Sequence, residues 1–129
     1  MMLSRVLAIV DATNEAIRIK RKISFHYYDY DNRKRHQRKN DGKPYTVSPY
    51  DLIYDGDFYY LTGFCDERGE VRVFRVDRIE NQPAITEITA ARPPKTYHVE
   101  KYTQEVFRME TIMVPGSRTT DMKKIVNMV

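Results

Sequence analysis

The sequence predicts a mainly β (α+β) domain: a small five-stranded barrel preceded by an N-terminal helix and followed by a short, partly helical C-terminal tail. Apolar residues recur at helical spacing over residues 3–20, and from residue 23 the period of the pattern changes to two. Five short extended segments separated by tight turns then follow, up to residue 89. Short strands joined by tight turns favour a small barrel over a parallel sheet.

Residues 3–20 are predicted to form an amphipathic helix. Its polar residues fall mainly outside one apolar stripe, which is formed by Leu3, Val6, Leu7, Val10 and Ile17. The basic residues at its end suit the negative end of the helix dipole. This accounts for part of the basic run from Arg18 to Lys22 without a ligand.

The five strands are predicted from alternation and turn signals. Residues 23–28 alternate, with Ile23, Phe25 and Tyr27 on the buried face. Residues 45–54 are extended, and Pro49 requires a bulge or an edge position there. Residues 58–65 and 71–76 pair across the turn 66–69, residues 77–82 form a corner, and residues 84–89 form a last strand. Further turns are predicted at Asp31-Asn32, Asp41-Gly42 and Asp55-Gly56-Asp57.

The tail begins with a predicted linker, Arg92-Pro93-Pro94-Lys95. Beyond it, helical spacing is shown by Val99, Tyr102, Val106 and Met109. Residues 121–129 are predicted to form a short last helix.

Composition favours one soluble, cytoplasmic domain with a short appendage. The chain has 129 residues, 41% of them hydrophobic, with no apolar stretch of membrane-spanning length and no signal-peptide pattern. Cys65 is the only cysteine, which excludes an internal disulfide and a cysteine-cluster zinc site. Positive charge is concentrated in residues 18–43, which hold ten basic residues and three acidic ones. Such a localised field suggests an anionic partner.

Several motifs between Lys22 and Ile79 resemble those of a WYL domain, a family named for a Trp-Tyr-Leu triplet in the third strand. They are Ile23-Ser24-Phe25-His26-Tyr27-Tyr28, Tyr45-Thr46-Val47-Ser48-Pro49-Tyr50-Asp51-Leu52, Tyr59-Tyr60-Leu61 and Arg72-Val73-Phe74-Arg75-Val76-Asp77-Arg78-Ile79. Tyr59 stands at the tryptophan position and keeps an aromatic ring.

The resemblance implies a five-stranded SH3-like barrel, related to the Sm fold. WYL domains typically form the sensing part of bacterial transcription regulators. Several bind nucleic-acid or nucleotide-like ligands through a basic groove, and the regulators are commonly homodimers. The corresponding division is an N-terminal helix at 1–21, the WYL domain at 22–91, and a linker with a truncated C-terminal extension at 92–129.

Two departures from the family pattern bear on the partners. The short segment before residue 22 leaves no room for the usual DNA-binding domain, which is expected on another chain or missing from this one. The tail after Pro94 begins like the family extension and is too short to form it whole. The chain is therefore expected to be either a stand-alone sensor or a fragment of a larger regulator.

Three arginines are candidate ligand contacts. Matched to the family, Arg72 and Arg78 come first and Arg75 next, because guanidinium groups suit phosphate oxygens and stack on bases. In a regular strand Arg72 and Arg78 share a face and Arg75 lies opposite. The alternative is that one of them pairs with Asp77 or Glu80 and holds the corner.

Three hydroxyl-bearing residues complete the candidate groove. Ser48 precedes Pro49, where a bulge would present its hydroxyl to a phosphate or base edge, although a bond to the backbone is the equal alternative. Tyr50 and Tyr60 are candidates for stacking on bases, whereas Tyr59 is expected in the core. The basic run Arg33–Lys39 either steers a polyanion to the groove or is a solvated edge.

No combination of residues predicts catalysis, a cofactor or a metal site. The sequence lacks a nucleophile–base pair, facing carboxylates and a close histidine pair. The expected function is effector sensing within a transcriptional regulator, with a single-stranded nucleic acid or a nucleotide as ligand. The alternatives are a protein-interaction or dimerisation module without a small ligand, and an Sm-like module that binds RNA directly.

Overall fold

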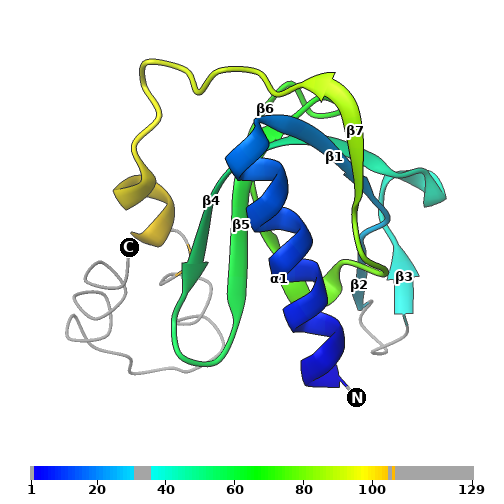
Figure 1. The fold of residues 1–129 in the computed structure, drawn as a ribbon. Helices are drawn as coiled ribbons and strands as arrows, with labels where there is room; N and C mark the ends of the chain where they lie inside the picture. The colour runs from blue at the N-terminus through cyan, green and yellow to red at the C-terminus, as the bar shows by residue number, and fades with distance from the viewer. Residues whose placement is uncertain (1, 31–35, 105, 107–129) are drawn as a thin grey trace.

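A computed structural model of the protein describes residues 2–30, 36–104 and 106 (Figure 1). One long helix opens the chain, and strands and two short 3-10 helices follow. In order these are α1 (Met2–Ile19), β1 (Arg21–Phe25), β2 (Tyr28–Tyr30), β3 (His36–Arg38), η1 (Asn40–Gly42), β4 (Tyr45–Tyr54), β5 (Tyr59–Cys65), β6 (Glu70–Arg75), η2 (Val76–Arg78) and β7 (Ala84–Thr89).

The five longer strands form one antiparallel sheet in the order β6-β5-β4-β1-β7. β4, β5 and β6 follow one another as a meander, and β7 returns to pair with β1 on its other side. Among the described strands, β6 and β7 are the two edges, so the sheet is open and the expected closed barrel is not confirmed. The sequence pattern predicts individual strands, whereas closure also depends on strand tilt and stagger.

Most predicted elements lie close to the observed ones, but the single strand predicted at 23–28 is wrong: β1 ends at Phe25, and β2 pairs with β3 in a separate two-stranded sheet. The strands at 45–54 and 84–89 match β4 and β7 at both ends, and the predicted helix differs from α1 by one residue at each end. β4 is a central strand, and its register with β5 shifts between Pro49 and Asp51. Pro49 therefore lies at a bulge, as one of the two predicted alternatives required, and not at an edge.

The first core lies between α1 and one face of the sheet. Ile9 and Ala16 of α1 pack with Ile23, Val47 and Leu61 from three strands, all 0% exposed. Full burial of a Val, Leu or Ile side chain contributes about 1.5–3 kcal/mol, so this cluster is the main support of the fold. Cys65 lies in the same core as a free, buried thiol.

A second, smaller core lies on the opposite face. Its buried members are Ile53, Tyr60 and Val106. Tyr60 and Leu61 are neighbours in β5, so their side chains point to opposite faces and enter different cores.

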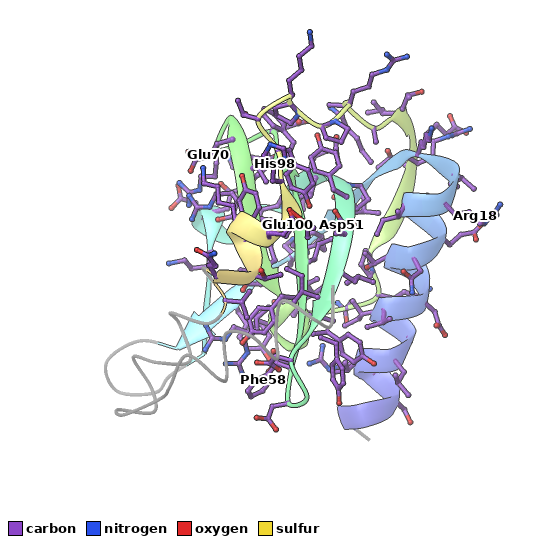
Figure 2. All side chains as sticks on the ribbon, turned by 90° about the vertical axis from the view of Figure 1, so that its left-hand side faces the viewer. Arg18, Asp51, Phe58, Glu70, His98 and Glu100 are labelled. Carbon is purple, nitrogen blue, oxygen red and sulfur yellow. The ribbon has the colours of Figure 1, made fainter. Side chains whose placement is uncertain are left out.

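The C-terminal strap, which we define as residues 91–104 together with Val106, covers this second face. The strap is helical at residues 99–104 and 106. Figures 1 and 2 show its helix on the opposite side of the sheet from α1. The segment that was predicted to be a linker thus leads into a part of the chain that packs on the sheet.

Several predictions lie outside the described residues: the turn at Asp31-Asn32, the basic residues 33–35, Met109 and the helix at 121–129. No helix in the described part of the chain is long and apolar enough to cross a membrane.

Candidate functional site

Arg72 lies on the edge strand β6 and remains accessible. Its side chain is 47% exposed and forms an ion pair with Glu70 at 2.9 Å. Exposed pairs of this kind contribute only about 0–1 kcal/mol, because water and salt screen both charges. Exchanging Glu70 for another anion at Arg72 would therefore cost little.

Arg75 holds the corner after β6. Its guanidinium donates two hydrogen bonds to the carboxylate of Asp77, at 2.7 and 2.8 Å, and stacks 3.8 Å from the centre of the Phe58 ring. Burial, which alone would raise the pKa of Asp77, is outweighed by these hydrogen bonds and by the positive charge, so that the pKa is lowered. The alternative in which one arginine fixes the corner is therefore realised by Arg75.

Arg72 and Arg75 point to opposite faces of β6, as strand alternation requires. Figure 2 shows Glu70, the partner of Arg72, near one end of the sheet and Phe58, the partner of Arg75, at the other. Arg78 is half-buried at the end of η2. The three arginines thus do not converge on one point in this structure.

A cleft of about 580 Å³ lies between β6 and the strap, and we call it the β6 cleft. Arg72 and Lys101 are the basic residues among those that line it, and Glu70 is the acidic one. Tyr97 and Tyr102 form an aromatic wall, with stacked rings whose centroids are 5.3 Å apart. A cleft with two cations and an aromatic wall suits a ligand that carries both a phosphate and a planar ring.

Ser48 and Tyr50 form hydrogen bonds with the first two residues of the strap. The Ser48 side chain is fully buried, and its hydroxyl accepts a hydrogen bond from the backbone N–H of Ala91 at 2.9 Å. The Tyr50 hydroxyl donates to the Arg92 carbonyl at 3.2 Å. Burial and, to a smaller extent, the charge of Asp66 raise the pKa of Tyr50.

Tyr60 is 2% exposed and packs under the strap with Val106. Burial and, next, the negative charge of Asp55 raise its pKa to about 12. Tyr59 points the other way and packs against the first core, as expected for that residue. Both faces of this strand are therefore covered, and Tyr60 is not available for stacking on a base while the strap is in place.

Tyr97 is the residue that sequence reasoning missed. The Tyr97 hydroxyl donates to Asp51 Oδ2 at 2.6 Å, and the Thr62 hydroxyl oxygen lies 2.7 Å from the Tyr97 hydroxyl oxygen (Asp51 is labelled in Figure 2). The Tyr97 ring also packs against Tyr50, with 5.2 Å between ring centroids. Burial is the main cause of a raised pKa of Tyr97, so its phenol stays protonated. An aromatic residue shortly after the Pro93-Pro94 pair was the only sequence signal for this anchor.

A second cleft, of about 430 Å³, lies on the other side of Tyr97. The end of α1, the β4 bulge and the start of the strap surround it, with Lys20 and Arg92 as its basic residues. Tyr97 lines both clefts and separates them. Among the described residues, no group of three His, Cys, Asp or Glu side chains is placed to hold a metal ion.

The fold and these clefts define a small, mainly β domain with a helix on one face and, on the other, a strap beside two clefts whose linings include basic residues. The WYL domain family matches residues 8–82. The chain belongs to the WYL domain family, as the motifs between Lys22 and Ile79 indicated.

Comparison with solved structures supports the same assignment. The chain is similar to proteasome accessory factor B/C (PafBC) of Arthrobacter aurescens, with a TM-score of 0.60 and 26% sequence identity over 75% of the chain. The matched region corresponds to 14% of the length of that protein. No curated protein matches the sequence.

Proposed function

We propose that the chain is the ligand-sensing domain of a transcriptional regulator and that it binds a nucleic-acid or nucleotide-like anion in the β6 cleft. Membership of the WYL family and the likeness to PafBC support a regulatory role. The observation that carries the ligand class is the position of Arg72 and Lys101 beside the stacked rings of Tyr97 and Tyr102 in one cleft.

The proposed binding step is an exchange of partners at Arg72. A ligand phosphate takes the place of the Glu70 carboxylate, and the fork of the guanidinium donates two hydrogen bonds to it. A base of the ligand stacks on the tyrosine wall, which contributes about 1–3 kcal/mol per base. Arg75 and Arg78 act at the corner that ends β6, where Arg75 is committed to Asp77.

The arrangement of the whole regulator is part of the proposal. We infer a cytoplasmic homodimer in which a DNA-binding domain, on this or another chain, reads the ligand state of the WYL domain. The return of β7 to β1 supports an SH3-like or Sm-like class with open edges. Ligand must favour one of two arrangements of the domain for a signal to pass.

The direct test is fluorescence anisotropy with labelled single-stranded DNA, single-stranded RNA and duplex DNA at two salt concentrations. Loss of a charge-assisted hydrogen-bonding group costs about 1.5–3 kcal/mol, so Arg72→Ala is expected to weaken single-strand binding by about tenfold or more. Glu70→Gln is expected to tighten binding, because it removes the competing carboxylate.

Arg18→Ala provides a matched control. Arg18 is also an exposed arginine in an ion pair, with Glu15 at 2.6 Å, and it lies on α1, away from the β6 cleft (Figure 2). Equal weakening by Arg18→Ala and Arg72→Ala would mean that binding depends on net charge alone, and this would refute the site. A strong preference for RNA over DNA would favour the alternative of an Sm-like module that binds RNA directly.

A second candidate function, protein interaction without a small ligand, is favoured by the edge strand β7. Ile88 is 56% exposed and Ile85 is 38% exposed on β7, which is an edge among the described strands, and sheet edges are common sites for strand addition. This candidate predicts that Ile88→Lys changes the oligomeric state and that Arg72→Ala does not.

A further inference from the structure

The strap contacts the same side chains that the sequence analysis assigned to the ligand. Ser48 accepts the Ala91 N–H, the Tyr50 hydroxyl donates to the strap backbone at Arg92, and Tyr60 is closed off by Val106. Three of the six candidate ligand contacts are thus occupied by the protein's own chain.

The strap supplies these side chains with the kinds of contact that a nucleotide would supply. The strap offers a hydrogen-bond donor to the serine hydroxyl and an acceptor to the Tyr50 hydroxyl. It also places the ring of Tyr97 against Tyr50, at 5.2 Å between centroids, where a base would stack. Because the strap satisfies these groups in the way a base and its phosphate would, both cannot occupy the face together.

Beyond the hydrogen bonds at Ala91 and Arg92, the described part of the strap is held in two regions. One is the polar anchor at the β4 bulge, where Tyr97 donates to Asp51 beside Thr62. The other is apolar, where Val106, with Val99 and Tyr102 beside it, packs against Ile53 and Tyr60.

Between Ala91 and Thr96 every strap residue is exposed, so the attachment depends on these few contacts. Segments with few buried contacts open locally at a lower free energy than the sheet that supports them.

We propose that the strap is an intramolecular competitor of the ligand: it opens as a unit and exposes Ser48, Tyr50 and Tyr60 to single-stranded nucleic acid. This rests on the proposed function and adds its regulation. Because Tyr97, Lys101 and Tyr102 of the strap line the β6 cleft, ligand held in that cleft leaves the strap in place. Ligand bound across the whole face displaces the strap and keeps only the contact with Arg72 on β6. The apparent affinity is then the intrinsic affinity reduced by the fraction of molecules whose strap is open.

Two variants weaken the polar and the apolar anchor of the strap separately. Tyr97→Phe keeps the ring and removes the hydroxyl that bonds Asp51, whereas Val106→Ala thins the apolar anchor and touches neither cleft. Tyr54→Phe is the matched control, because it also removes one tyrosine hydroxyl, which donates to the Gly56 carbonyl at 2.8 Å in an exposed turn.

Hydrogen exchange and anisotropy with single-stranded DNA are measured on the same full-length variants. Loss of a hydrogen bond to a charged group is expected to raise the open fraction by about tenfold or more. Exchange at residues 91–104 should rise by that factor while exchange in β4 and β5 does not change. The affinity for single-stranded DNA should rise by a similar factor in both strap variants and not in Tyr54→Phe.

The outcomes separate this inference from the proposed function. If Arg72→Ala weakens binding but neither strap variant tightens it, competition is refuted and the β6 cleft stands. If the strap variants bind DNA more tightly and Arg72→Ala has no effect, competition stands and the assignment of Arg72 fails. Absence of binding in the strap variants would refute competition, and so would faster exchange across the whole sheet.

Discussion

Gly63 is the glycine at which one added methyl group should lower the stability of the fold most. It lies in β5 between Pro49 of the β4 bulge and Arg72 of β6. A Cβ atom at Gly63 would lie 2.5 Å from the Ser48 carbonyl oxygen and 2.6 Å from Val47 Cγ1. Both distances are far shorter than van der Waals contact, and one involves backbone in a paired strand. Gly63→Ala therefore requires β4 and β5 to move apart at the bulge.

The expected cost can be worked from this geometry. Overpacking by one methylene costs about 1–3 kcal/mol, and the backbone contact places Gly63→Ala near the upper end, at about 3 kcal/mol. For a domain of this size that corresponds to a fall of about 10–20 °C in Tm. Because the bulge carries Asp51, the bond to Tyr97 should loosen as well.

Urea denaturation followed by tyrosine fluorescence measures the effect, since the chain has ten tyrosines and no tryptophan. Gly69→Ala is the control: its φ of +68° makes alanine unfavourable, but no atom lies within 4 Å of the added Cβ. It should cost only about 1–2 kcal/mol. If Gly63→Ala proves no more destabilising than Gly69→Ala, the close approach of the two strands is refuted.

The corner pair and the buried tyrosine give two pH-dependent predictions. Arg75→Gln should cost about 1.5–3 kcal/mol at pH 7. This deficit should shrink as the pH falls below the ordinary Asp pKa of 3.8, because a lowered folded pKa stabilises only while Asp77 is ionised. Urea titrations at neutral and acid pH test it, and a deficit that stays constant would contradict the pairing. In alkali, Tyr60 has a folded pKa of about 12 against 10.0 when unfolded, so stability should decline between those values. Tyr60→Phe should flatten that decline in alkaline denaturation curves, and an unchanged slope would show that Tyr60 titrates normally.

The elements of the fold could be predicted because their signals are local. Alternation placed the strands, and proline at position 49 required a bulge or an edge, which the central place of β4 then decided. Barrel closure could not be predicted, because it depends on how strands distant in sequence are staggered.

The candidate site was harder to predict because burial by a distant segment leaves no local signal. The β5 pattern correctly separated Tyr59 from Tyr60, but it did not indicate that the strap covers the second face. The apolar stripe of Val99, Tyr102 and Val106 predicted a helix without naming the surface it packs on. The sequence could assign Arg75 to the corner only through a pairing with Asp77, two positions away. Ligand binding by the same arginine was the other alternative.

The return of β7 to β1 has a consequence for how the domain acquires its structure. Ile23 pairs with Ile85, whereas Tyr54 pairs with Tyr59 across a tight turn. Closing the longer loop costs about 2 kcal/mol more in chain entropy. The β4–β5–β6 meander is thus expected to form early and the β1–β7 pair late. Until β7 arrives, β1 is an open edge beside the newly docked helix, and a nascent chain is then most prone to associate with another copy.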